Sequence, residues 1–184
     1  MLAGTLFQIH LVAGYAAWLL AVGAYVWPWL KSRPRDDALR AIATLHGFRF
    51  FGLVFILPGV VGTHLPAGFA AFAAQWDLAT GVLALLALLA VRMRPLFWLL
   101  VVAFNVVGLV DLVMDYVHAI QGGLPEVAGE LGAAYAIPVL YVPLLMITHV
   151  AALCLLVRSM RNRWGGVALQ ARRAGHAGSP RSDR

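Results

Sequence analysis

Long apolar runs separated by short polar segments dominate the chain. Five of these runs are close to the length of about 20 residues that a helix needs to cross a hydrocarbon core of roughly 30 Å. They cover approximately residues 6–30, 45–63, 75–91, 95–117 and 136–157. The pattern predicts an all-α integral membrane protein whose residues 1–164 form a single bundle of five transmembrane helices.

Lys and Arg residues lie almost entirely in segments that would face one side of the membrane. The segment after the first run holds Lys31, Arg33, Arg35 and Arg40, the segment after the third run holds Arg92 and Arg94, and seven arginines follow residue 157. Cytoplasmic loops carry the excess of Lys and Arg in membrane proteins. We therefore expect the N-terminus outside, the C-terminus in the cytoplasm, and a bacterial inner-membrane location. Residues 165–184, rich in Arg, Gly and Ser, are predicted to form a basic disordered cytoplasmic tail.

The composition supports this class and excludes others. Hydrophobic residues make up 62% of the chain and charged residues only 12%, against about 25% charged residues in soluble domains. The single cysteine, Cys154, excludes a disulfide scaffold. The net charge of +6 suggests nucleic-acid binding, but the basic residues flank apolar runs of membrane length. The expected partner is therefore the lipid bilayer, and no nucleic acid is expected.

Two aspartates inside the predicted spans share one depth. Asp77 and Asp111 lie 15 and 17 residues from the basic residues of the loop between their spans, or about 22 and 25 Å at a rise of 1.5 Å per residue. Asp115 and His118 follow Asp111 by four and seven residues, so the three share one helix face. The sequence predicts an outer binding layer of Asp77, Asp111, Asp115 and His118, because buried ionisable groups in membranes are costly and usually functional.

A second polar layer is expected nearer the cytoplasm. Arg49 lies 15 residues before His64, which follows the second run, or about 22 Å below the outer face. Asn105 and His149 lie about 16 and 13 Å above the inner boundary by the same count. We therefore predict an inner layer of Arg49, Asn105, His149 and His46. Asn105 and Asp111 are six residues apart, which predicts different faces of one helix, so the two layers need not form one continuous path.

Simpler roles stay open for several of these residues. Arg49 could extend its side chain to the inner headgroups, and Asp77 could cap the third helix at the outer interface. Asn105 could join two helices by hydrogen bonds. His149 could donate to a carbonyl that a nearby proline frees. These roles need no ligand.

The same side chains allow two kinds of cofactor. Carboxylate and imidazole groups can ligate a divalent metal ion, for which the candidates are Asp111, Asp115, His118, His10 and His64. A haem would need histidines from two helices at similar depth, as in the pairs His46 with His149, or His10 with His118 or His64. No serine-nucleophile, phosphate-loop or dinucleotide signature is present, which favours a non-enzymatic role.

The spacing of several residues resembles an uncharacterised family of small bacterial multi-pass membrane proteins. The resemblance covers roughly residues 45–157 and rests on five short patterns. They are Phe48-Arg49 with Gly52, Leu65-Pro66-Ala67 with Phe69-Ala70, Asp77 with Gly81, Asn105 with Gly108 and Asp111, and Pro143 with His149. That family has Gly before the first Asp, where this chain has Trp76. The resemblance implies that these polar residues matter and implies no activity.

Three functions fit the sequence. The first is a protein that binds or helps to move a small solute or cation, with or without proton coupling, through an outward-facing site at Asp77 and Asp111. The second is a redox protein that binds haem or quinone through Arg49 and His149. The third is a structural or assembly subunit of a membrane complex. Five spans are few for a self-contained carrier, so a homo-oligomer or a partner membrane subunit fits the first and third functions.

Overall fold

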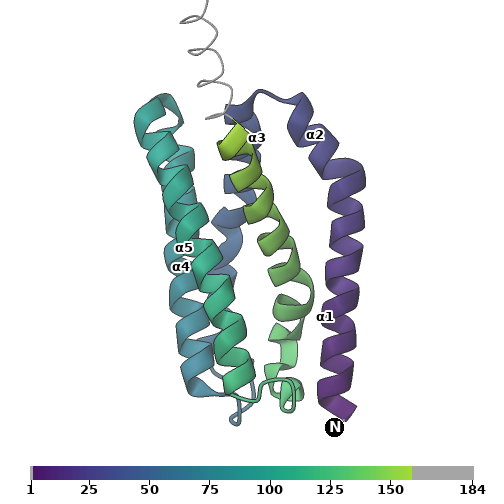
Figure 1. Cartoon of the computed structure of the whole chain (residues 1–184). Coiled ribbons are helices and arrows are strands. Elements are labelled where there is room, and N and C mark those ends of the chain that lie inside the picture. The colour runs from purple at the N-terminus through teal and green to yellow at the C-terminus, as the bar shows by residue number, and fades with distance from the viewer. Residues whose placement is uncertain (1, 159–184) are drawn as a thin grey trace, which may run out of the picture.

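The computed structural model describes residues 2–158, and this part of the chain is helical with no strand (Figure 1). Five of its helices are long and apolar enough to cross a membrane. They are Leu2–Ser32, Arg35–Ile56, Gly68–Arg92, Arg94–Gln121 and Ile137–Arg158. The predicted all-α fold with five candidate spans is confirmed. The predicted tail at residues 165–184 lies outside the described residues.

The first span lies at the edge of the bundle (Figure 1). It consists of α1 (Leu2–Ala21), a π-helical turn, η1 (Val22–Val26), and α2 (Trp27–Ser32). Only Phe7 and Gly14 of α1 are buried. The indole Nε1 of Trp18 donates to the carbonyl of Leu140 at 2.8 Å, which ties α1 to the last span.

The second span differs from its predicted bounds at both ends. It begins with α3 (Arg35–His46) instead of residue 45. This helix buries Leu39 and Ile42, but its first turn carries two aspartates. It is amphipathic and therefore does not form a continuous apolar run, which is the signal used to predict the spans. The span ends at Ile56 instead of residue 63. Pro58 disfavours helix at the residue before it, and Gly59 has φ of +81°. Pro58, which falls within the predicted span 45–63, therefore lies beyond the end of the helix.

The second half of this span, after α3, is a long 3₁₀ helix, η2 (Gly47–Ile56). A 3₁₀ helix has three residues per turn, so residues three apart lie on one face. Arg49, Gly52 and Phe55 have this spacing and are buried. Phe48, Phe50 and Phe51 are exposed on the other faces. The geometry therefore points the one charged residue of η2 into the bundle and surrounds it with aromatic residues that face outward.

The next two spans form an antiparallel pair that packs beside η2 (Figure 1). They are α4 (Ala67–Leu89), extended by η3 (Ala90–Arg92), and α5 (Arg94–Gln121). A connecting segment with the 3₁₀ helix η4 (Ala128–Tyr135) leads into a π-helical turn, η5 (Ile137–Tyr141), and the last span continues from it to Arg158. The α4 helix starts eight residues before the predicted residue 75, because its first two turns are apolar.

Two apolar clusters lie at different heights of the bundle, and buried polar residues lie between them. One cluster includes Phe7, Phe55 and Phe69. The other includes Leu39, Phe97, Phe104 and Ala152. The buried polar side chains are His46, Arg49, Asp77, Thr80, Asn105, Asp111, Asp115, Thr148 and His149. These polar groups therefore form a layer with an apolar cluster on each side.

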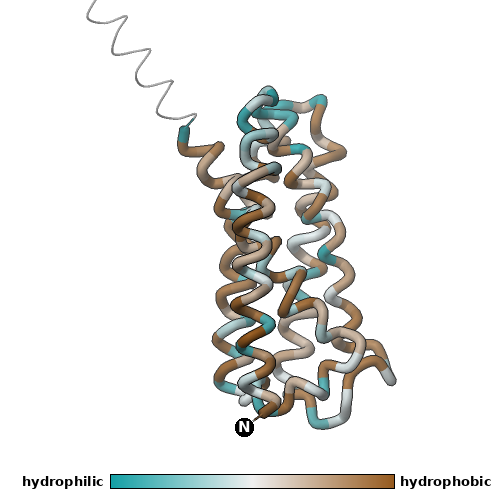
Figure 2. The backbone as a smooth tube through the Cα atoms, turned by 90° about the vertical axis from the view of Figure 1, so that its right-hand side faces the viewer, coloured by the Kyte–Doolittle hydropathy of each residue, from teal (hydrophilic) through white to brown (hydrophobic). Residues whose placement is uncertain are grey.

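We call one end of the bundle the basic end, because Lys31, Arg33, Arg35, Arg94 and Arg158 line one cavity there. The start of α1 and the segments 57–66 and 122–135 lie at the opposite end (Figure 1). Figure 2 shows hydrophilic residues gathered at the basic end and mainly hydrophobic residues along the helices.

Candidate functional site

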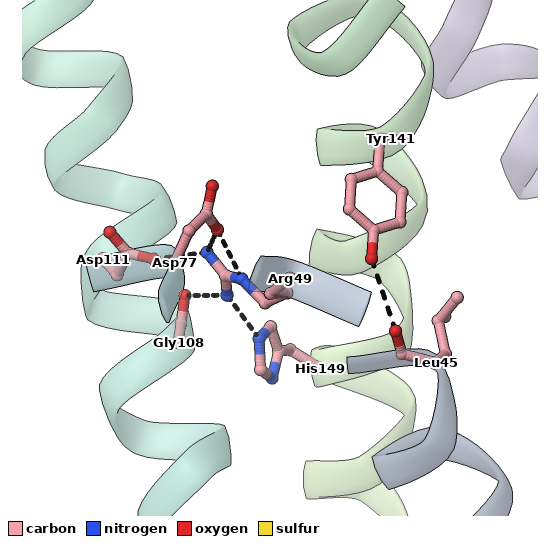
Figure 3. A network of polar contacts seen from close by, with 7 residues as sticks. All are labelled: Leu45, Arg49, Asp77, Gly108, Asp111, Tyr141 and His149. Atoms are coloured by element: carbon pink, nitrogen blue, oxygen red, sulfur yellow. Dashed lines mark hydrogen bonds and ion pairs between the residues drawn. The ribbon is translucent and has the colours of Figure 1, made fainter. Parts of the chain in front are cut away.

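Arg49 lies at the centre of a buried network that joins four segments (Figure 3). Its side chain is 0% exposed. Its Nε donates to Asp77 Oδ1 at 2.6 Å, and Nη2 lies 2.5 Å from the same oxygen. Nη2 also donates to Asp111 Oδ2. Nη1 lies 3.3 Å from both the Gly108 carbonyl and His149 Nε2. Charge-assisted hydrogen bonds of this kind are among the stronger polar contacts in proteins.

The absence of a side chain at Gly52 allows α4 to approach η2 closely enough for the ion pair. A Cβ atom built on Gly52 would lie 2.6 Å from Asp77 Cβ and 2.7 Å from Asp77 Cγ, closer than atoms can pack. Gly52 is one 3₁₀ turn after Arg49, so it faces the same side of the bundle. The sequence Phe48-Arg49-Phe50-Phe51-Gly52 thus encodes both the cation and the space that its partner occupies.

A chain of hydrogen bonds fixes His149 beside the guanidinium. Asn105 Nδ2 donates to the Val101 carbonyl at 2.7 Å, which turns Asn105 Oδ1 toward His149. This oxygen can only accept, so His149 Nδ1, at 3.0 Å, carries the hydrogen. His149 Nε2 then has a free lone pair and accepts from Arg49 Nη1. His149 is therefore neutral in this arrangement, with its hydrogen on Nδ1.

This assignment predicts the NMR spectrum of the histidine. We expect the ¹⁵N signals of His149 to show a neutral ring with a protonated Nδ1 and an unprotonated Nε2. Asn105→Leu removes the acceptor and should weaken this tautomer, whereas substitution of the exposed His64 should leave the His149 signals unchanged. A ring protonated on Nε2 in the unmodified protein would contradict the assigned network.

His46 continues the polar cluster toward the basic end. Its ring lies 3.9 Å from the ring of His149, measured between centroids. Thr148 Oγ1 donates to a carbonyl of its own helix, so it accepts from His46 Nε2 at 3.1 Å. The two imidazole rings are in contact and three of their four nitrogens make hydrogen bonds. This pair therefore leaves no space for a haem between its rings.

The buried acidic groups outnumber the buried basic group. Asp77, Asp111 and Asp115 are 6%, 1% and 8% exposed, and Arg49 is the only buried Lys or Arg among residues 2–158. Asp111 Oδ1 and Asp115 Oδ1 are buried without a hydrogen-bond partner within that range. An unpaired charge in a low-dielectric interior is costly. The site can therefore accept a further positive charge.

A cavity of about 210 Å³ reaches this acidic group. Asp77 and Asp115 line it, together with Tyr116, whose hydroxyl lies 2.8 Å from that of Tyr15. Most other lining residues are apolar and come from the cluster nearer the opposite end. They include Phe7, Leu11, Phe55, Phe69, Ala119 and Leu124. The cavity thus combines carboxylate oxygens with aromatic and aliphatic walls.

The other predicted histidines lie in separate contacts. The His118 ring packs against Phe72 at a tilt of 57°, with 4.4 Å between the ring centroids. His10 Nδ1 lies 2.8 Å from the Tyr135 hydroxyl, and the backbone N–H of His64 donates to Glu130. Within residues 2–158, no three His, Cys, Asp or Glu side chains are placed to hold a metal ion. The predicted metal candidates Asp111, Asp115, His118, His10 and His64 are therefore not brought together.

The structure corrects the separation of the two predicted layers. Arg49 contacts Asp77, Asp111 and His149, so it joins them. The predicted depth of Arg49 below the outer face was wrong because its helix ends at Ile56, only seven residues after Arg49. At the 3₁₀ rise of 2.0 Å per residue, Arg49 lies about 14 Å from that helix end. Asp77 lies ten residues after the start of α4, or about 15 Å from the same end.

Asn105 and Asp111 are both buried, on either side of Gly108. They reach the same network through different partners, because Asn105 contacts His149 and Asp111 contacts Arg49. Sequence reasoning also missed two contributors to the network, the Gly108 carbonyl and the Thr148 hydroxyl. Thr148 could have been identified as a candidate, because it is a polar residue next to His149 within a predicted span. The Gly108 carbonyl could not, because every residue has a backbone carbonyl.

Comparisons with known proteins place the chain in a family. No curated protein and no solved structure matches it. A family model described as "Domain of unknown function (DUF8737)" matches residues 6–157. This range contains all five candidate spans except for a few terminal residues and includes every residue of the Arg49 network. The chain therefore belongs to the DUF8737 family.

Proposed function

We propose that the chain is a multi-pass protein of a bacterial cytoplasmic membrane, with its N-terminus outside and its C-terminus in the cytoplasm. Five long apolar helices support membrane insertion. The basic residues at one end of the bundle support the orientation, because Lys and Arg are enriched in cytoplasmic segments. In this orientation the cavity beside Asp115 lies in the outer half of the bundle.

We further propose that the chain binds a small organic cation at Asp77, Asp111 and Asp115. The observation that carries this proposal is Asp115, a residue that lines the cavity and whose buried Oδ1 has no hydrogen-bond partner among residues 2–158. Three buried carboxyl groups lie in a cluster that holds one buried guanidinium, so a bound positive charge would offset part of the excess of acidic groups. Phe7, Phe55 and Phe69 line the same cavity. Aromatic rings attract alkylammonium groups, which favours a cation with an apolar body.

The packing favours access from the opposite end. The cluster that includes Leu39, Phe97, Phe104 and Ala152 lies between His46 and the basic end. The cavity instead extends from Asp77 and Asp115 along residues such as Leu124 and Pro125, which lie at the opposite end. We infer a binding site that is open toward the outside and closed toward the cytoplasm. Transport would require a change in this packing.

Thermal unfolding in mild detergent tests the proposal. Choline is the probe, and the control ligand is its uncharged analogue in which carbon replaces nitrogen. At a concentration 100 times its Kd, a ligand stabilises the folded state by about 2.7 kcal/mol. For a chain of this size that is a rise in Tm of roughly 5–10 °C. We expect this rise with choline and not with the uncharged analogue, and we expect Asp115→Asn to abolish it.

Two controls make the result specific. Asp37→Asn makes the same chemical change at an exposed carboxylate and should keep the full response. Asp115→Asn should fold at least as stably as the unmodified chain without ligand, because it removes an unpaired buried acid. Equal responses of the two variants to choline would contradict a site at Asp115. No response of the unmodified chain to choline would contradict the proposed class of ligand.

The two other functions receive less support from the geometry. Haem binding through His46 and His149 conflicts with their ring contact and their hydrogen bonds. An assembly role would use the Arg49 network only to hold helices together. That role accounts for the ion pairs with Asp77 and Asp111. It gives no reason for an unpartnered Asp115 beside a cavity.

A further inference from the structure

A second cavity lies at the basic end, away from the Arg49 network. Its volume is about 650 Å³, and it lies where α2, α3, α5 and the last span converge. Five of its lining residues are basic and one is acidic. They are Lys31, Arg33, Arg35, Arg94, Arg158 and Asp36. Five positive charges and one negative charge leave a net charge of +4 around the cavity.

One ion pair neutralises part of this charge. Arg94 Nη2 donates to Asp36 Oδ2 at 2.9 Å. Lys31, Arg33 and Arg158 lie around the same space, and like charges held close together repel one another. A multivalent anion such as a phosphate group would relieve this repulsion and accept several hydrogen bonds at once.

Two helix N-termini add to the positive potential. Arg35 begins α3, which has 12 residues, and Arg94 begins α5, which has 28. Neither helix has a side-chain hydrogen bond at its N-cap. The first backbone N–H groups of a helix have no partner within the helix, and the helix dipole favours anions there. Both helix starts line the cavity through these arginines.

Tryptophans hold the basic side chains in place. The guanidinium of Arg35 lies 4.1 Å from the ring centroid of Trp98, and that of Arg33 lies 5.3 Å from the ring of Trp29. Arg158 lies 5.4 Å from the ring of Trp27. Such contacts are attractive cation–π interactions, and they reduce the side-chain freedom that ligand binding would otherwise cost.

We propose that this cavity binds the phosphate headgroup of an anionic phospholipid. A lipid is favoured over a free phosphate because the cavity is also lined by Leu30 and Leu155, which belong to the apolar cluster below it. Tryptophan is enriched at membrane interfaces, at the level of the headgroups. Basic pockets between transmembrane helices on the cytoplasmic side suit anionic headgroups. The inference is independent of the proposed cation site.

Native mass spectrometry of the full chain in mild detergent tests the inference. The probes are phosphatidylglycerol, the zwitterionic phosphatidylcholine, and glycerol phosphate as a soluble phosphate. The pocket variant is Arg33→Gln with Arg158→Gln. The control is Arg40→Gln with Arg92→Gln, which removes two exposed basic residues that do not line the cavity. The two variants have the same net charge.

The expected result is preferential binding of phosphatidylglycerol over phosphatidylcholine by the unmodified chain and by the control. Binding by the pocket variant should be at least tenfold weaker. An equal loss in both variants would overturn the inference, because it would show a diffuse attraction between charges. Competition by glycerol phosphate at the same concentration as the lipid would also overturn it, because the site would then recognise free phosphate.

Discussion

Replacement of Arg49 by methionine is expected to destabilise the protein by about 3–5 kcal/mol. This is a large part of the roughly 5–15 kcal/mol that stabilises a typical folded domain. Methionine fills a similar space but donates no hydrogen bond, so Asp77 and Asp111 would remain buried without their shared cation. Thermal unfolding in mild detergent, together with the yield of monodisperse protein, measures the effect.

A second set of variants separates lost charge from lost packing. Asp77→Asn and Asp111→Asn, added to Arg49→Met, should restore much of the stability, because an uncharged replacement of a whole buried ion network is often neutral. The matched control is Arg40→Met, at an exposed arginine whose one ion pair is with Asp37. Exposed pairs contribute about 0–1 kcal/mol. Equal effects of Arg49→Met and Arg40→Met would contradict the buried network.

Gly108→Ala is expected to have the second largest effect, a loss of about 1–3 kcal/mol from overpacking. The new Cβ would lie 2.5 Å from His149 Nε2 and 2.6 Å from Thr80 Cγ2. His149 cannot move away easily, because it is hydrogen-bonded to Asn105 and its ring is in contact with that of His46. Its displacement would also remove one acceptor of the Arg49 guanidinium. Thermal unfolding and the ¹⁵N signals of His149 report both effects.

Gly23→Ala is the matched control for this substitution. A Cβ atom at Gly23 would have no atom within 4 Å apart from its chain neighbours and the backbone of its own helix. Alanine is the better helix former by up to about 1 kcal/mol, so this variant should be as stable as the unmodified chain or more stable. Gly108→Ala has the same intrinsic preference for helix, which isolates the steric cost. Equal stability of Gly108→Ala and Gly23→Ala would contradict the close packing around Gly108.

The number of spans could be predicted from the sequence, whereas some of their ends could not. Runs of apolar residues have a clear length signal, which is why the last span agrees with its predicted bounds within one residue. The start of α3 is not part of a long apolar run, because the buried residues Leu39 and Ile42 lie in the sequence among charged residues such as Asp37 and Arg40. The 3₁₀ geometry of η2 was also missed, although its glycines and its three-residue spacing are present in the sequence.

The residue types of the candidate site could be predicted better than its connections. Arg49, Asp77, Asn105, Asp111 and His149 are ionisable or amide groups in apolar runs, so their cost in a membrane marks them. Their depths depend on where each helix ends, and the early end at Ile56 brought Arg49 to the level of Asp77. The position of Asp115 beside the cavity and the shape of the cavity depend on tertiary packing, which cannot be predicted from any one apolar run.

Calorimetric titration of choline into the purified chain tests the central claim most directly, because it measures binding without the need for unfolding. The account predicts saturable binding by the unmodified chain and by Asp37→Asn, and no binding by Asp115→Asn in a protein that still unfolds cooperatively. Binding that is unchanged in Asp115→Asn, or no binding by the unmodified chain, would contradict the proposed cation site.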